Sequence, residues 1–173
     1  MISDMSDKIV IRFDDLDIGS HSFDFEVDNE FFKKFDHHDF LSCNLKIAIN
    51  LIKDERNLTL ITSINGAAEV ECDRCLDPLT LPIGLNETFF VKESENDSDD
   101  DNVINVSKDD IEIDLSNQIF DIVVLSLPMQ KIHPNDENGE STCNANQIMF
   151  MTSEEKEDEE IDPRWEALKN LKK

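Results

Sequence analysis

The sequence predicts an α+β fold, in which an antiparallel β-sheet meander is packed by one or two helices and interrupted by acidic disordered loops. Three stretches, 41–52, 58–72 and 79–92, carry apolar residues at most second positions, as half-buried strands do. Short turns join these stretches, which favours antiparallel neighbours. The apolar segment 115–127 has helical spacing, so we expect it to cover one face of the sheet.

Two shorter alternating stretches precede this meander. Residues 9–13 and 23–27 each alternate apolar and polar side chains, which predicts two further strands. Asp28 then stands where it can cap a short helix that carries Phe31 and Phe32 on one side.

Two residues predict irregularities inside the meander. Gly66 interrupts the second long strand, and an isolated glycine in a strand often marks a β-bulge. Pro82 cannot donate a backbone hydrogen bond, so we expect the third strand to lie at an edge or to start irregularly.

The second half of the chain predicts fewer regular elements. Residues 103–113 return as one or two short strands, and Asp114 is placed to cap the helix that Pro128 ends. Residues 131–147 are polar, and we expect a loop there.

We expect a single domain over residues 8–173, because 173 residues are enough for one hydrophobic core. Residues 93–102 predict an acidic disordered loop, and 152–161 an acidic linker, since such runs repel themselves and bury nothing. An Asp-Pro pair opens the segment 162–173, which predicts a C-terminal helix.

The charge of the chain restricts its partners. The formal net charge is −24, and so acidic a surface repels nucleic acid, because phosphate binding needs Lys and Arg. Direct nucleic-acid binding is therefore disfavoured, and basic proteins are favoured as partners. The plainer interpretation of the charge is solubility alone.

The sequence predicts a cytoplasmic location for this protein. The N-terminus lacks the basic flank and apolar core of a signal peptide, and no apolar run is long enough for a membrane helix. The cysteines are too few and too scattered for the disulfide framework of a small secreted domain.

A Cys-x-x-Cys pair, Cys72 and Cys75, stands at the turn between two predicted strands. Such a turn can supply two ligands to a tetrahedral zinc site, and His133 with Cys143 would complete it. Cys43 falls on an apolar strand position, which indicates a core residue. The alternative is that the pair consists of reduced thiols that bind no metal.

Disulfide chemistry at this pair is the weaker interpretation. A redox Cys-x-x-Cys opens a helix, whose N-terminus lowers the thiol pKa, whereas a strand follows here. We expect the carboxylates of Glu71, Asp73 and Asp77 to disfavour a thiolate. The chain also has no Gly-rich phosphate loop and no distinct acid–base pair, which argues against an enzyme.

Three segments, 70–79, 113–129 and 162–171, together resemble the YceD family, the large ribosomal RNA subunit accumulation proteins of bacteria and plastids. The first is similar to that family's Cys-x-Arg-Cys-Leu signature, and the order of all three matches. The resemblance covers roughly residues 8–173. It implies a non-enzymatic role in the synthesis, processing or accumulation of large-subunit ribosomal RNA.

The resemblance also has a departure. Many members of that family carry a second Cys-x-x-Cys after the helix, whereas this chain has Cys143 alone, with His133 ten residues earlier. A four-cysteine site is therefore excluded, and a mixed Cys/His zinc site is what the residues leave. The alternative function is a zinc-binding module that delivers or senses zinc.

The charge and the resemblance together predict a basic ribosomal protein, or a pre-ribosomal large-subunit particle, as the partner. The residues that we expect to bind it are Arg74, Arg164, Trp165, Leu168 and Lys169. In the C-terminal segment, the apolar stripe with Trp165 could instead pack on the protein's own sheet.

Overall fold

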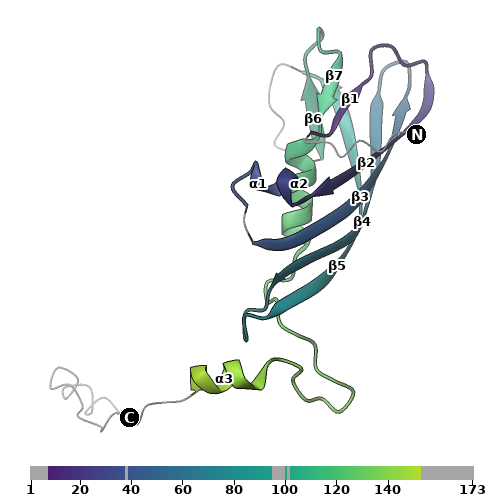
Figure 1. Cartoon of the computed structure of the whole chain (residues 1–173). Coiled ribbons are helices and arrows are strands. Elements are labelled where there is room, and N and C mark those ends of the chain that lie inside the picture. The colour runs from purple at the N-terminus through teal and green to yellow at the C-terminus, as the bar shows by residue number, and fades with distance from the viewer. Residues whose placement is uncertain (1–7, 38, 95–99, 101, 153–173) are drawn as a thin grey trace, which may run out of the picture.

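The computed structural model describes residues 8–37, 39–94, 100 and 102–152, and its centre is a five-stranded sheet in the order β2-β3-β4-β5-β6 (Figure 1). A separate two-stranded sheet pairs β1 with β7. The elements along the chain are β1 (Val10–Arg12), β2 (Gly19–Asp28), α1 (Asn29–Lys33), β3 (Phe40–Lys53), β4 (Leu58–Glu71), β5 (Pro78–Glu93), β6 (Val103–Val106), β7 (Glu112–Asp114), α2 (Ser116–Ser126) and α3 (Ala145–Thr152).

The predicted α+β fold and its three long strands are confirmed. Strands β2 to β5 form an antiparallel meander, in which Ile47 lies opposite Ile64 and Ile64 opposite Leu85. The alternation arises because the buried side chains project toward one face of this sheet. Ile47 and Ile64 are buried on that face, and Leu85 is half-buried against them.

The last strand makes the sheet mixed, because β6 pairs in parallel with β5, and only along Phe90–Glu93. The earlier part of β5 therefore has a neighbour on one side only among the described strands, and Pro82 lies in this part. Phe90 donates its N–H to Asn102 on the β6 side, 2.8 Å away. Pro82 has the same parity, so the N–H that proline lacks would point to the open edge, as predicted for an edge position.

The predicted bulge at Gly66 is wrong. The β3–β4 register runs through Leu45 and Gly66 without a break, and the register shift lies instead between Phe40 and Ser42. Gly66 has a different reason to be glycine, because a Cβ there would lie 2.2 Å from the carbonyl oxygen of Asn44. The two strands approach too closely at this point for any side chain.

Two helices cover the apolar face of the sheet, and Figure 1 shows α1 and α2 on the same side of it. Asp28 caps α1 as predicted, since its carboxylate accepts the N–H of Glu30 at 2.9 Å. The two helices meet through the rings of Phe32 and Phe120, whose centroids are 6.2 Å apart, and Phe35, just after α1, stacks on Phe120 at 4.4 Å.

Helix α2 begins at Ser116, one residue later than predicted, and its cap is likewise one residue later than Asp114. Leu115 is the N-cap residue, while the Asp114 carboxylate accepts the N–H of Ser116 at 2.9 Å. On its inner face Ile119 and Val123 are fully buried, so α2 packs on the core as expected.

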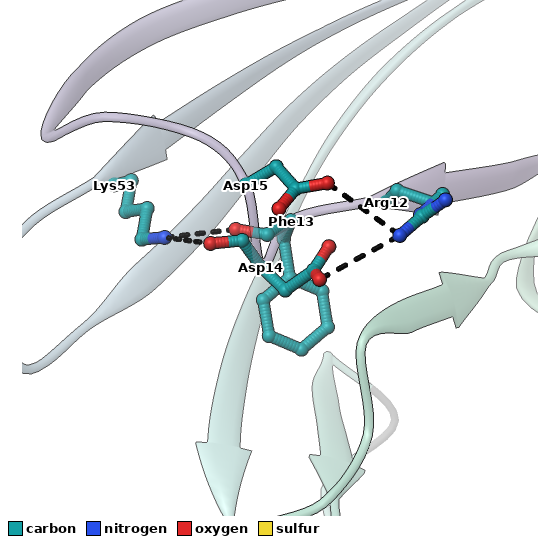
Figure 2. A network of polar contacts seen from close by, with 5 residues as sticks. All are labelled: Arg12, Phe13, Asp14, Asp15 and Lys53. Atoms are coloured by element: carbon teal, nitrogen blue, oxygen red, sulfur yellow. Dashed lines mark hydrogen bonds and ion pairs between the residues drawn. The ribbon is translucent and has the colours of Figure 1, made fainter.

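A lysine holds the connection between β1 and β2 against the end of β3 (Figure 2). The Nζ of Lys53 donates to the carbonyl oxygens of Phe13 and Leu16, both at 2.8 Å, and to that of Asp14 at 3.4 Å. Arg12 forms ion pairs with Asp14 and Asp15 nearby, but these groups are largely exposed and stabilise the fold little.

Within the described ranges, no helix is both long and apolar enough to cross a membrane.

Candidate metal centre

Three thiols and one imidazole meet beside the β4–β5 turn. The ligand atoms of Cys72, Cys75, His133 and Cys143 all lie within 4.8 Å of one another. The Nδ1 of His133 is 3.5 Å from the Sγ of Cys75 and 3.8 Å from that of Cys143, and the Sγ atoms of Cys72 and Cys143 are 3.9 Å apart. Ligand atoms in a tetrahedral zinc site lie about 3.5–4 Å apart, so this donor set could hold a metal ion.

The first two thiols come from a tight turn that the sheet itself positions. β4 ends at Glu71 and β5 begins at Pro78, which leaves residues 72–77 to reverse the chain. Within them Cys72 donates its N–H to Asp77 at 3.0 Å, and Leu76 donates its N–H to Cys72 at 2.9 Å. Closing this turn places Leu76 in the left-handed region, at φ 61°.

The other two ligands come from the chain that follows α2. His133 and Cys143 flank a small hairpin, in which Asn135 and Ser141 form an antiparallel bridge. The Asp136 carboxylate accepts the N–H groups of Asn138 and Glu140 at 2.9 and 2.8 Å. The hairpin reverses the direction of the chain. His133 and Cys143, ten positions apart in the sequence, are thereby brought next to each other and next to the thiols of the turn.

Hydrogen bonds tie the turn to this hairpin segment. Asp73 donates its N–H to the carbonyl of Lys131 at 2.7 Å, and its carboxylate accepts the N–H of Lys131 at 2.6 Å. Arg74 donates to the hydroxyl of Ser141 at 3.2 Å, and Asn144 donates to the carboxylate of Asp77 at 2.9 Å. These hydrogen bonds hold the turn that carries Cys72 and Cys75 against the segment that carries His133 and Cys143, independently of the four side chains themselves.

The contacts of His133 fix which of its nitrogens can bind a metal. Its Nε2 lies 3.1 Å from the carbonyl oxygen of Pro78, which can only accept a hydrogen bond. Nε2 therefore carries the proton in the neutral ring, and the lone pair of Nδ1 faces the thiols of Cys75 and Cys143. Histidines that bind metals usually donate their second N–H to a carbonyl or carboxylate in this way.

The pKa values of the four side chains in the cluster are shifted in different directions. Burial raises the pKa of the Cys72 thiol, but the backbone N–H groups of Arg74, Cys75 and His133 outweigh it and bring the pKa to about 6. A hydrogen bond with Ser141 is the largest effect that lowers the pKa of Cys143, while burial raises that of Cys75. Hydrogen bonds with Cys143 and Cys72 raise the pKa of His133.

The expectation that carboxylates would disfavour a thiolate here is wrong for Cys72, whose pKa is lowered. Asp73 and Asp77 direct their carboxylates to Lys131 and Asn144 in the hairpin segment. The backbone N–H groups of the turn act on the sulfur instead, and a charged hydrogen bond to a thiolate favours the thiolate.

The cluster is enclosed. Cys72 and Cys75 are fully buried, Cys143 is buried and His133 is half-buried. All four cysteines of the chain are free thiols, and the 3.9 Å between the sulfurs of Cys72 and Cys143 is a non-bonded distance. Such closure is typical of structural metal sites, because catalytic sites keep one position open.

Two of the other predicted residues, Cys43 and Arg74, lie in the described part of the chain, and neither is among the four clustered donors. Cys43 is a core residue of β3, where burial raises its thiol pKa to about 12, as expected of a cysteine that binds no metal. Arg164, Trp165, Leu168 and Lys169 lie outside the described residues. Arg74 contacts Ser141 beside the ligands, and its expected role toward a partner stays a prediction.

Sequence reasoning missed two parts of the centre. Helix α3 begins at Ala145, inside a segment predicted as loop, and Asn144 and Gln147 at its start donate to Asp77. Asn144 is the type of residue that precedes a helix, and its side-chain amide oxygen Oδ1 accepts the N–H of Asn146. The sequence therefore contained a signal for the start of this helix, but it gave no indication that Asn144 and Gln147 would bind Asp77.

Comparison with protein-family models gives a match to the family described as "Large ribosomal RNA subunit accumulation protein YceD", over residues 60–172. The match begins in β4 and includes the whole metal centre, and it leaves β1, β2, α1 and β3 outside. Searches of curated proteins and of solved structures gave no significant match. The family model covers well over half of the chain and the resemblance drawn from its motifs agrees, so this chain belongs to the YceD family.

Proposed function

We propose that this protein supports the accumulation of large-subunit ribosomal RNA without acting as an enzyme. The match to the YceD family over residues 60–172 carries this proposal, since that family is described by the accumulation of this RNA. The buried, closed donor set supports the non-enzymatic part, because it leaves no open position at which a substrate could bind.

The mode of action that we propose is protein binding. A net charge of −24 makes a direct grip on RNA unfavourable, while it attracts basic proteins and speeds their approach. The partner is therefore a basic ribosomal protein, free or on a pre-ribosomal large-subunit particle. Because the attraction is electrostatic at long range, we expect binding to weaken as salt is added.

The metal that we propose for the centre is zinc, held by Cys72, Cys75, His133 and Cys143. Three sulfur ligands and one imidazole are a set that zinc prefers, and the Nδ1 lone pair of His133 already faces the sulfurs. When bound, zinc would supply a cross-link between the β4–β5 turn and the segment after α2. The enclosure of the ligands favours this structural role over zinc delivery or sensing, which need an exchangeable ion.

Deletion of the gene tests the proposed function. We expect large-subunit ribosomal RNA to fall relative to small-subunit RNA, and a plasmid copy of the wild-type gene to restore the ratio. A strain that keeps its subunit-RNA ratio in both rich and poor medium would contradict the role. Metal analysis of the protein purified without added zinc tests the centre separately, with about one zinc per chain expected.

A further inference from the structure

A small pocket lies beside the metal centre, at the β4–β5 turn. Its volume is about 230 Å³, and the buried Cys72 forms part of its wall. Two leucines from different elements line it, Leu41 in β3 and Leu76 in the turn. Both are large apolar side chains that are substantially exposed, Leu41 at 43% and Leu76 at 52%.

Leu76 is unusual in its backbone as well as in its exposure. At φ 61° it occupies the left-handed region, where Gly is preferred and Asn is tolerated because a larger side chain crowds the backbone. A leucine there destabilises the turn, and half of its surface stays in water instead of packing in the core. Folding therefore does not account for this side chain, whereas an apolar contact with another molecule does.

The charges around the pocket point to a basic partner. Asp39 and Glu71 line it, and neither carboxylate has a hydrogen-bond or ion-pair partner in the part of the chain that the structure describes. Among the described residues that line the pocket, Lys131 is the only cation, and Asp73 adds a third carboxylate. The pocket thus combines an apolar wall with a net negative rim, on a protein that is itself strongly acidic.

We propose that this pocket docks a basic segment of a protein partner, which inserts one apolar side chain between Leu41 and Leu76. The inference rests on the proposed function, and it assigns the partner-binding surface to the metal-centre end of the sheet. The metal centre would then help to shape the pocket, since Cys72, Asp73 and Leu76 of the turn and Lys131 of the segment after α2 line it together with Leu41 of β3.

The test measures peptide binding by the full-length, zinc-loaded protein. The probes are synthetic fluorescent peptides that tile the ribosomal proteins of the large subunit, with scrambled peptides of equal charge beside them. We expect the tightest peptides to place a Leu, Ile, Met or Phe between Lys or Arg residues. Their affinity should fall as salt is raised and exceed that of the scrambled versions.

Two variants of Leu76 separate docking from folding. Leu76→Gly and Leu76→Asn both suit the left-handed backbone, so the melting temperature should stay the same or rise. Peptide affinity should nevertheless fall about tenfold or more, because a buried leucine contact is lost. The matched control is Ile18→Asn, which removes an exposed apolar side chain (64% exposed) at the opposite end of the sheet and should leave affinity unchanged.

Three results would overturn the proposal. Peptides that bind no better than their scrambled versions would exclude a specific site. Equal affinity in the wild type and Leu76→Gly, or equal loss in Ile18→Asn, would place binding elsewhere. Concentration-dependent dimerisation that Leu76→Gly abolishes would assign the pocket to a second copy of this chain.

The same variants distinguish failure of this inference from failure of the proposed function. If deletion lowers large-subunit RNA but Leu76→Gly restores the ratio as fully as the wild type, the function holds and the docking site is wrong. If the deletion strain is normal while peptides still bind at Leu76, the site stands and the cellular role is wrong.

Discussion

Between Phe40 and Glu93 the chain forms three long strands with alternately buried side chains, whereas between Lys131 and Asn144 it contains one isolated bridge and turns. The first region is stabilised by many apolar contacts of the same kind, so that its shape does not depend on any single one of them. The second is held by a few hydrogen bonds, most of them between exposed groups, and by the contacts of His133 and Cys143 with Cys72 and Cys75. We therefore expect substitutions in the sheet to act on global stability, and substitutions at the centre to act on metal binding and local order.

The largest effect should come from a charge placed in the sheet core. Ile49 is buried on β3, so Ile49→Asp would bury an unpaired carboxylate and lower the free energy of unfolding by about 4 kcal/mol. Urea unfolding measures this loss. Asn50→Asp is the control, because Asn50 is only half-buried, and it should cost roughly 0.5 kcal/mol or less. Equal urea midpoints for Ile49→Asp and the wild type would show that the assigned core face is wrong.

The next largest effect should come from the close approach of β3 and β4. Gly66→Ala would place a Cβ 2.2 Å from the Asn44 carbonyl oxygen, and the strands would have to move apart. We expect the free energy of unfolding to fall by about 3 kcal/mol. Gly84→Ala is a matched control on β5, where the nearest atom to the added Cβ would be 3.9 Å away. If thermal unfolding gave both alanine variants the same stability, backbone crowding could not be the reason for Gly66.

The sheet was predictable because its signal is redundant. The alternation predicted strands at 41–52, 58–72 and 79–92, and no end of these strands is more than one residue from the observed end. The prediction is this close because every buried position along a strand indicates the same inward-facing side. Gly66 shows the limit of this reasoning. A glycine in a strand indicates that something special happens there, but the sequence cannot distinguish a bulge from a close approach, because the crowding atom belongs to another strand.

The cysteines allow the two regions to be separated in one experiment. Cys143→Ser should lose the zinc and lower the free energy of unfolding by about 2 kcal/mol, since the metal no longer stabilises the native state. Amide hydrogen exchange should rise in 131–147 and stay slow in β3 and β4. Cys43→Ser is the converse control, because Cys43 is a core residue, and it should lose stability while it keeps the zinc. Zinc content that responds equally to both variants would contradict the assignment of ligands.

The ligand set was predictable only in outline. The Cys-x-x-Cys spacing of Cys72 and Cys75 indicates a possible metal site. His133 and Cys143 were predicted to complete it because the chain offers few other ligands. What holds them together was not predictable, because the bonds of Asp73, Arg74 and Asp77 reach residues about 60 to 70 positions away. A local pattern has no information about such partners, and the expected effect of these carboxylates on the thiols was consequently wrong for Cys72.

The smallest effect on stability should come from a residue that joins the two regions without binding metal. The Asp73 carboxylate accepts the N–H of Lys131 at 2.6 Å, so Asp73→Ala removes a bond that aligns the two ligand pairs. We expect about 1 kcal/mol less stability and about tenfold weaker zinc binding, measured by competition with a chromophoric chelator. Asp73→Asn keeps an acceptor oxygen and should retain most of the zinc affinity. If both variants bound zinc as tightly as the wild type, the ligands would be held by their own segments alone, and the bond between turn and hairpin would have no part in forming the centre.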